Sequence, residues 1–321
     1  MVNYFHLLGK PRKRSGLFLC YTFPMKTIVT GGAGFIGSHL VDLLLSEGHE
    51  VHIVDNLSSG SRDNIRPNAV FHEIDVRDQV ALTELFSGAD IVFHLAANAR
   101  LQFSIEQPIE TNDNNVGGTL SVLCAARDAG VKRVVYAASS SAYGDSDADI
   151  LSETLLPNPK SPYAVQKYVG ELYARSFNQC YGLQTVALRF FNVYGPRQSA
   201  KGAYAPVIPI FLESKKKGDA LPVVGTGTQT RDFTHVSDVA RALYLAATLP
   251  NVGNGEVINI GAGEEHSILE LAEMIGGPIQ HLPPRIEVMR TRADVSRAKE
   301  LLNWEPKKNF AEAIEELKRL Y

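Results

Sequence analysis

A glycine-rich turn between an apolar run and a helical run constrains this 321-residue chain more than any other feature. Residues 26–30 are typical of a short buried strand, and residues 35–47 carry apolar side chains at helical spacing. Between them the spacing of Gly31, Gly34 and Gly37 provides a tight turn, a close approach to the backbone and close helix packing. Because free N–H groups at a helix start bind phosphate, the pattern predicts a dinucleotide site.

An acidic residue follows the next predicted strand. Asp55 ends the apolar run at 50–55 and lies 18 residues beyond Gly37. A carboxylate at about this distance hydrogen-bonds the adenosine ribose of a bound dinucleotide, and its charge repels a 2′-phosphate. The sequence therefore predicts NAD rather than NADP.

Strand and helix patterns alternate along the rest of the chain without hairpin signals. Further strands are expected at 70–74, 90–95, 133–138, 185–190 and 256–260, and helices at 78–87, 109–129 and 162–182. This alternation is typical of an α/β fold with a parallel, doubly wound Rossmann sheet and right-handed crossovers. Since ligands of such sheets bind beyond the carboxyl ends of the strands, Asp55, Ser139 and Asn192 should meet in one crevice.

The expected domain organisation is interleaved. Residues 25–191 plus 234–261 should form the NAD-binding Rossmann domain, and residues 192–233 plus 262–321 a smaller substrate-binding lobe. Residues 1–24 are interpreted as a disordered extension before the first strand, with a tether to a membrane surface as the alternative. Their apolar stretch is too short to span a bilayer.

Composition fits a cytoplasmic enzyme without a nucleic-acid or membrane partner. The formal net charge of −3 leaves no basic footprint for nucleic acid. The three cysteines are widely spaced and show no metal-binding pattern, so no metal site is expected.

A second motif carries the chemistry. Ser161 and Pro162 are typical of the cap and first residue of a helix, which places Tyr163 and Lys167 one turn apart on the same face. A tyrosine with an ordinary pKa of ~10 needs on the order of 4 kcal/mol of stabilisation to act as a base at neutral pH. The lysine ammonium and a cationic nicotinamide ring are expected to lower that pKa, while Ser139 steadies the substrate oxygen.

Together these segments resemble the extended short-chain dehydrogenase/reductase family, and within it the nucleotide-sugar 4-epimerases. The resemblance covers residues 25–321. It is carried by TGGAGFIG at 30–37, FHLAA at 93–97, SSSAYGD at 139–145, PYAVQK at 162–167, RFFNVYGPRQ at 189–198 and RDFTHVSDVA at 231–240.

The resemblance implies a reaction and a set of site residues. Tyr163 would deprotonate the sugar 4-hydroxyl while hydride passes to NAD. The 4-keto sugar would then rotate about its diphosphate and take the hydride back on its other face. The catalytic residues would be Ser139, Tyr163 and Lys167. Those contacting NAD would be Gly31, Gly34, Phe35, Ile36, Gly37, Asp55, Asn56, Asp75, Val76, Leu95, Ala96, Ala97, Tyr163 and Lys167. Those contacting the UDP-sugar would be Ser139, Ser140, Ser141, Asn192, Ala205, Val207, Arg231, Arg285 and Thr291.

The family's other activities are weighed at the same positions. Dehydratases carry an Asp-Glu pair after the first serine and decarboxylases keep an acid at the third position, whereas this chain has Ser140 and Ser141. Epimerisation is therefore favoured. A protein that binds NAD and a nucleotide sugar without turnover is a further alternative.

The sugar itself stays open. Thr291 stands where enzymes restricted to plain hexoses resemble one another in carrying a tyrosine, which favours UDP-GlcNAc and UDP-GalNAc beside UDP-Glc and UDP-Gal. The loop at 98–104 departs from the N-acetylhexosamine pattern, so a uronic acid paired with Arg100 is the alternative. The resemblance also implies a homodimer formed through the helices at 109–129 and 162–182.

Overall fold

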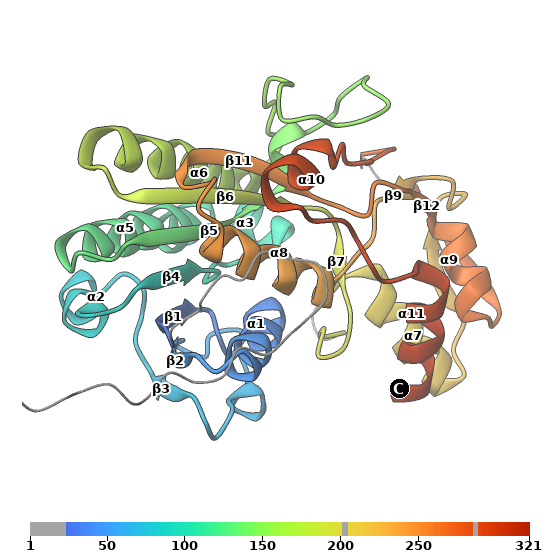
Figure 1. The fold of residues 1–321 in the computed structure, drawn as a ribbon. Coiled ribbons are helices and arrows are strands. Elements are labelled where there is room, and N and C mark those ends of the chain that lie inside the picture. Colours follow the sequence, from blue (N-terminus) through green and yellow to red (C-terminus); the bar gives the residue numbers. More distant parts are fainter. Residues whose placement is uncertain (1–23, 201–204, 285–287) are drawn as a thin grey trace, which may run out of the picture.

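The computed structural model describes residues 24–200, 205–284 and 288–321 (Figure 1). The disordered extension expected at residues 1–24 lies outside this part of the chain except for its last residue. No helix in the described segments is long and apolar enough to cross a membrane.

Seven strands form one parallel sheet in the order β11-β6-β5-β4-β1-β2-β3. All six pairings between neighbours are parallel. The α/β parallel sheet predicted from the strand and helix patterns is confirmed. The first and last residue of each strand lie within two residues of the expected ones. The strands are β1 (Lys26–Thr30), β2 (Glu50–Val54), β3 (Val70–His72), β4 (Ile91–His94), β5 (Arg133–Ser139), β6 (Gln184–Phe190) and β11 (Asn254–Ile260).

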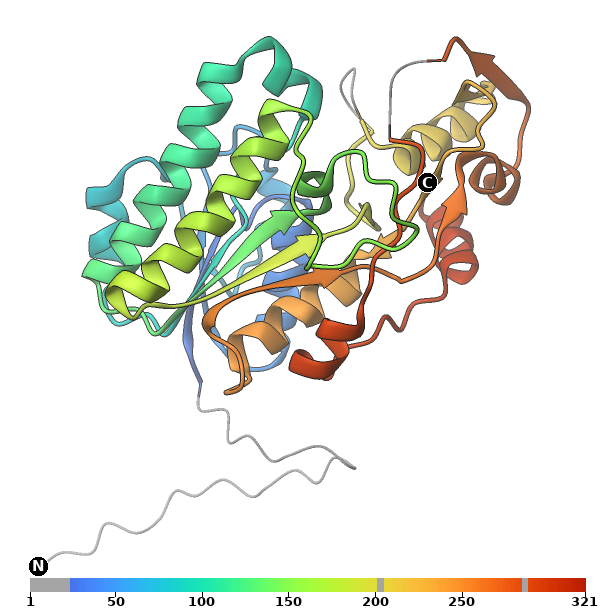
Figure 2. The ribbon, with the colours of Figure 1, turned by 90° about the horizontal axis from the view of Figure 1, so that it is seen from above.

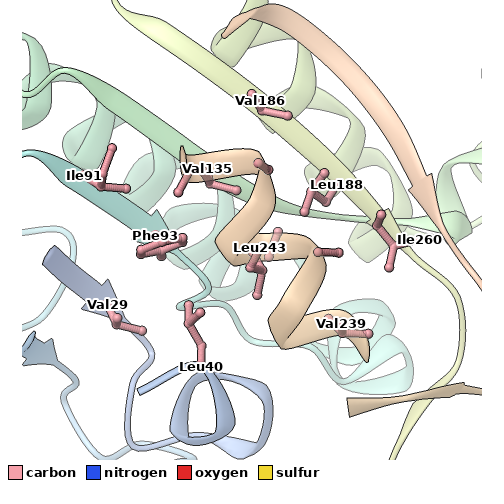
Figure 3. Packing of buried hydrophobic residues seen from close by; sticks show 14 of the residues in the cluster. Val29, Leu40, Ile91, Phe93, Val135, Val186, Leu188, Val239, Leu243 and Ile260 are labelled. Carbon is pink, nitrogen blue, oxygen red and sulfur yellow. The ribbon is translucent and has the colours of Figure 1, made fainter. Parts of the chain in front are cut away.

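Helices cover both faces of the sheet (Figures 1 and 2). On one face α1 (Phe35–Ser46), α8 (Val236–Thr248) and α10 (Ser296–Leu302) share a buried core with β1, β4, β5, β6 and β11. Figure 3 shows Leu243 of α8 lying against the sheet between Val135 and Leu188. On the other face lie α2 (Gln79–Phe86), α5 (Gly118–Asp128) and α6 (Pro162–Tyr181).

The helix expected at 109–129 is present and contains one π-helical turn. It divides into α4 (Pro108–Asn112), the π-helical turn η2 (Asp113–Gly117) and α5. The Thr119 hydroxyl donates to the Asn115 carbonyl at 2.6 Å, and the Asn115 side chain reaches the backbone of Asn98. The Asn115 side chain thus connects the π-helical turn to Asn98, a contact between distant residues that apolar spacing does not indicate.

A smaller lobe has a buried core of its own, which includes Phe211, Leu271 and Ile314. It contains α7 (Val207–Lys217), β8 (Leu221–Val224), α9 (Ile268–Ile275), β13 (Ile279–Leu282) and α11 (Phe310–Leu320). Two short pairs join it to the sheet, β7 (Val193–Tyr194) with β10 (Thr234–His235) and β9 (Thr230–Arg231) with β12 (His266–Ser267). The remaining elements are the 3₁₀ turns η1 (Arg62–Asn64) and η3 (Ser140–Tyr143) and the short helix α3 (Leu101–Glu106).

We expect Gly37→Ala to destabilise the protein, because a Cβ at this position would lie 2.2 Å from the Gly31 carbonyl oxygen. The clash is with backbone, so the free energy of unfolding should fall by roughly 1–3 kcal/mol. Gly117→Ala is the matched control, since a Cβ there meets nothing within 4 Å. Urea unfolding measures both variants, and equal stability of the two would contradict the packing role of Gly37.

Candidate active site

The carboxyl ends of the parallel strands form one edge of the sheet, and the predicted site residues gather along it. Thr30 of β1 is in register with Val54 of β2 and with His94 of β4. Further along, Ser139 of β5 pairs with Phe190 of β6. This edge faces the smaller lobe (Figure 2). The segments that follow these strand ends therefore lie together, as a ligand at such an edge requires.

The glycine turn at 31–37 forms a cradle of backbone atoms, and a side chain in place of Gly31 or Gly37 would collide with neighbouring backbone atoms. Gly31 has a φ of +72°, and a Cβ there would lie 2.7 Å from the backbone nitrogen of Ala96. Helix α1 begins directly after Gly34, and no side chain caps its first backbone N–H groups, which are therefore available to an anion. Of the first helical residues, Phe35 meets the His39 ring edge-on and Ile36 packs against the core.

Asp55 organises the loop beside this cradle. Its carboxylate accepts hydrogen bonds from the backbone nitrogens of Ala33 at 3.0 Å and Leu57 at 2.8 Å. Burial raises the pKa of Asp55, and these two N–H groups oppose the rise. Glycine turn, uncapped helix start and carboxylate together fit the pyrophosphate and ribose of NAD.

The remaining predicted cofactor contacts border the same turn. The Asn56 side chain donates to Asp75 at 3.0 Å, and the Arg77 guanidinium holds the pKa of that carboxyl well below its usual range. Val76 is buried. The segment of Leu95, Ala96 and Ala97 continues β4, and Leu95 donates its N–H to the Thr30 carbonyl at 3.1 Å.

Helix α6 begins as the sequence predicts. Ser161 is the N-cap and accepts from the Ala164 nitrogen at 3.2 Å, with Pro162 at the first helical position. Lys167 is buried, and its ammonium donates to the Ala137 carbonyl of β5 at 2.8 Å. Burial lowers the pKa of Lys167 to about 8, against a smaller opposing effect of the Glu171 carboxylate.

Tyr163 and Ser139 meet in a hydroxyl cluster. Ser139 Oγ accepts from the Ser141 nitrogen at 3.2 Å and from Ser141 Oγ at 2.9 Å, so its own proton is available for a further acceptor. Ser140 lies between these two serines and is the first residue of the 3₁₀ turn η3. Burial raises the pKa of Tyr163, and a hydrogen bond with the Ser139 side chain lowers it. In the protein alone the pKa of Tyr163 is therefore raised rather than lowered, and the group that opposes the rise is Ser139 and not Lys167 as expected.

On the side of the smaller lobe, Asn192 is hydrogen-bonded to Thr291. The Asn192 amide donates to Thr291 Oγ1 at 3.2 Å and to the Asp232 carbonyl at 3.1 Å. Arg231 donates to the Thr230 carbonyl at 2.8 Å. Ala205 and Val207 are partly buried at the start of α7. Arg285 lies outside the described residues.

Asp232 is a site residue that the sequence reasoning missed. Its buried carboxylate accepts from the backbone nitrogens of Ala262 at 2.6 Å, Ala293 at 2.9 Å and Gly263 at 3.0 Å. Burial raises the pKa of Asp232 to about 6, while these N–H groups oppose the rise. The carboxylate thus holds the segment that carries Thr291 against the sheet. Asp232 stands in the mixed segment RDFTHV at 231–236, where the neighbouring residue types do not distinguish a buried carboxylate from an exposed one.

Comparison with known proteins agrees with this geometry. The model of the family described as "NAD dependent epimerase/dehydratase family" matches residues 27–261. A UDP-glucose 4-epimerase of Mycolicibacterium smegmatis is 39% identical over 305 residues, which are 90% of this chain and 96% of that protein. The solved UDP-N-acetylglucosamine 4-epimerase of Methanobrevibacter ruminantium, in complex with UDP-N-acetylmuramic acid, superposes with a TM-score of 0.88 at 35% identity. The match covers 93% of this chain and 98% of that one.

A relative with a different activity also matches. A UDP-N-acetyl-α-D-glucosaminuronate decarboxylase of Bacillus cytotoxicus is 35% identical over 312 residues, covering 91% of this chain and 96% of that protein. Family membership thus fixes the fold and the cofactor, while the reaction has to be argued from the site. The chain belongs to the NAD-dependent epimerase/dehydratase family.

Proposed function

We propose that this protein is an NAD-dependent 4-epimerase of a UDP-sugar. The observation that carries the proposal is the cluster of Ser139, Tyr163 and Lys167 at the carboxyl edge of the sheet, beside the cradle that fits NAD. When bound, NAD accepts hydride from the sugar C4 and returns it.

Tyr163 and Ser139 then have separate tasks. Tyr163 takes the proton of the 4-hydroxyl, and the Ser139 hydroxyl, which accepts from Ser141, donates a hydrogen bond to the same oxygen as it becomes a carbonyl. Burial holds the pKa of Tyr163 above its ordinary value in the protein alone. The Ser139 hydrogen bond opposes that rise, and the positive charge of a bound nicotinamide ring would favour the phenolate further.

The serines beside Ser139 favour epimerisation over the family's other reactions. The Ser141 hydroxyl is turned onto Ser139, at the position where the resemblance leads us to expect an acid in decarboxylases and dehydratases. With hydroxyls at 140 and 141, water loss or decarboxylation has no carboxylate at these positions to assist it. The match to a decarboxylase makes decarboxylation of a UDP-uronic acid the second candidate.

The sugar pocket favours UDP-GlcNAc and UDP-GalNAc beside UDP-Glc and UDP-Gal. Thr291 is a small side chain, and its hydroxyl is already engaged by Asn192 and by the Asp232 nitrogen. It leaves room for an N-acetyl group that a tyrosine would fill. Exposed Arg100 keeps UDP-glucuronate as the alternative substrate. Asn192, Arg231 and Arg285 are proposed to hold the diphosphate, and Ala205 and Val207 to line the uridine.

We also propose a homodimer formed through the helices around 109–129 and 162–182. Helix α6 exposes Val165 and Leu172, at 45% and 44% of their surfaces, and α4 exposes Ile109 at 78%. We infer that a second copy covers these apolar side chains, which lie on neighbouring helices.

Incubation of the NAD-loaded protein with each UDP-sugar tests the reaction. We expect conversion of UDP-GlcNAc to UDP-GalNAc without added reductant, and slower conversion of UDP-Glc, both resolved by chromatography. Absence of 4-epimers from every UDP-sugar tried would contradict the proposal. A decarboxylated product from UDP-glucuronate would favour the second candidate.

Tyr163→Phe should lower turnover on the order of 10²- to 10⁴-fold, because it removes only the hydroxyl that moves the proton. Binding of NAD and UDP-sugar, measured by calorimetry, should change little. Tyr181→Phe removes a hydroxyl from an exposed tyrosine of the same helix and is the matched control. Equal turnover of Tyr163→Phe and wild type would exclude the assigned mechanism.

Leu172→Lys should convert the dimer to a monomer, since it places a charge in the proposed contact. Val80→Lys, on the exposed face of α2, is the control and should leave the dimer intact. Light scattering after size-exclusion chromatography gives the mass of each. A monomeric wild-type protein would contradict the proposed dimer.

A further inference from the structure

The backbone donors at the start of α6 are divided between two serines. The Ala164 nitrogen donates to the cap, Ser161 Oγ, at 3.2 Å. The Tyr163 nitrogen donates instead to Ser104 Oγ of α3 at 3.0 Å, and Pro162 has no N–H to place. The backbone of the proposed base is therefore tied to a side chain nearly sixty residues earlier in the chain.

Ser104 is built for this bond. It is fully buried, and its hydroxyl donates to the Leu101 carbonyl at 2.5 Å while its oxygen accepts from Tyr163. Its own nitrogen donates to the Arg100 carbonyl at 3.1 Å. One buried hydroxyl thus couples the turn at 100–104 to the catalytic helix, with both its donor and its acceptor in use.

The other end of the same segment is tied to the same helix. Asn115, in the π-helical turn η2, accepts from the Asn98 nitrogen at 2.7 Å and donates to the Asn98 carbonyl at 3.0 Å. Its amide also donates to Gln166 Oε1 at 2.8 Å. Gln166 lies between Tyr163 and Lys167 on α6, is buried, and donates to Thr111 at 3.0 Å.

Residues 98–104 are thus attached to α6 at both ends, directly from Ser104 to Tyr163 and through Asn115 from Asn98 to Gln166. Between these ends Ala99, Arg100 and Leu101 are exposed, while Gln102 and Phe103 are partly buried. The buried polar side chains of the two attachments are hydrogen-bonded, which makes such a network rigid and specific. The exposed part of the segment, which follows the carboxyl end of β4, is therefore attached to α6 on both sides.

We propose that Ser104 and Gln166 are positioning residues that fix the segment 99–103 relative to Tyr163, and that this segment holds the sugar ring with its C4 at the Tyr163 hydroxyl. The inference rests on the proposed function and deepens it. It assigns sugar alignment to two buried side chains that lie away from the reacting atoms.

Ser104→Ala and Gln166→Met test the inference, with Ser176→Ala and Gln179→Met on the exposed face of α6 as matched controls. Hydrogen exchange of the NAD-loaded protein should quicken at least about tenfold at 98–104 in the first pair and stay unchanged in the controls. Normalised to folded, NAD-loaded protein, kcat should fall on the order of 10- to 100-fold. Part of the bound NAD should stay reduced during turnover, because a loosely held keto sugar leaves before the hydride returns.

Two results would overturn the inference: exchange at 98–104 that is unchanged in the variants, or faster exchange with a normalised kcat equal to that of the controls. Because kcat is normalised to folded, NAD-loaded protein, a variant that merely folds less well shows no change in the normalised kcat. Wild-type turnover tests the proposed function independently. If the wild type converts no UDP-sugar, the proposed function fails, and the exchange measurement still decides whether Ser104 and Gln166 hold the segment.

Discussion

The active-site edge depends on a row of charges buried between α6 and the sheet. Lys167 donates to the Ala137 carbonyl and lies over the Tyr136 ring at 5.1 Å. One turn further along α6, Glu171 pairs with Arg189 of β6 through two hydrogen bonds of 2.9 and 2.7 Å. A buried charge without a partner costs several kcal/mol, so these partners hold α6 in one register on the sheet. Because Tyr163 lies near the start of the same helix, its position depends on that register.

A second set of buried polar contacts connects this helix to the cofactor turn. His94 bonds to the Thr30 hydroxyl at 2.8 Å and to the Thr119 hydroxyl at 2.9 Å, and Thr119 in turn bonds to the Asn115 carbonyl. Burial lowers the pKa of His94 to about 3, so the ring is neutral and bonds on both sides. The glycine turn, the π-helical turn and α6 are thereby joined through side chains, so the proposed cofactor and sugar sites would share one geometry.

Much of this could be predicted from local sequence. The Ser161–Pro162 start of α6 and the close packing of Gly37 follow from capping and steric rules, and the structure has both. The features that were not predicted are contacts between residues distant in the chain. In the π-helical turn the Asn115 side chain bonds to Asn98, and the buried Asp232 carboxylate accepts from N–H groups at 262, 263 and 293. The pKa of Tyr163 likewise depends on its burial, which one motif cannot reveal.

The central claim is that the hydrogen on the sugar C4 leaves and returns within one bound complex. A UDP-sugar deuterated at C4 tests this directly, with unlabelled NAD bound and ordinary water as solvent. The account predicts that the 4-epimer keeps the deuterium at C4, because the hydride never exchanges with water. Product with hydrogen at C4, or deuterium found in the solvent, would contradict it and would point to proton abstraction at carbon.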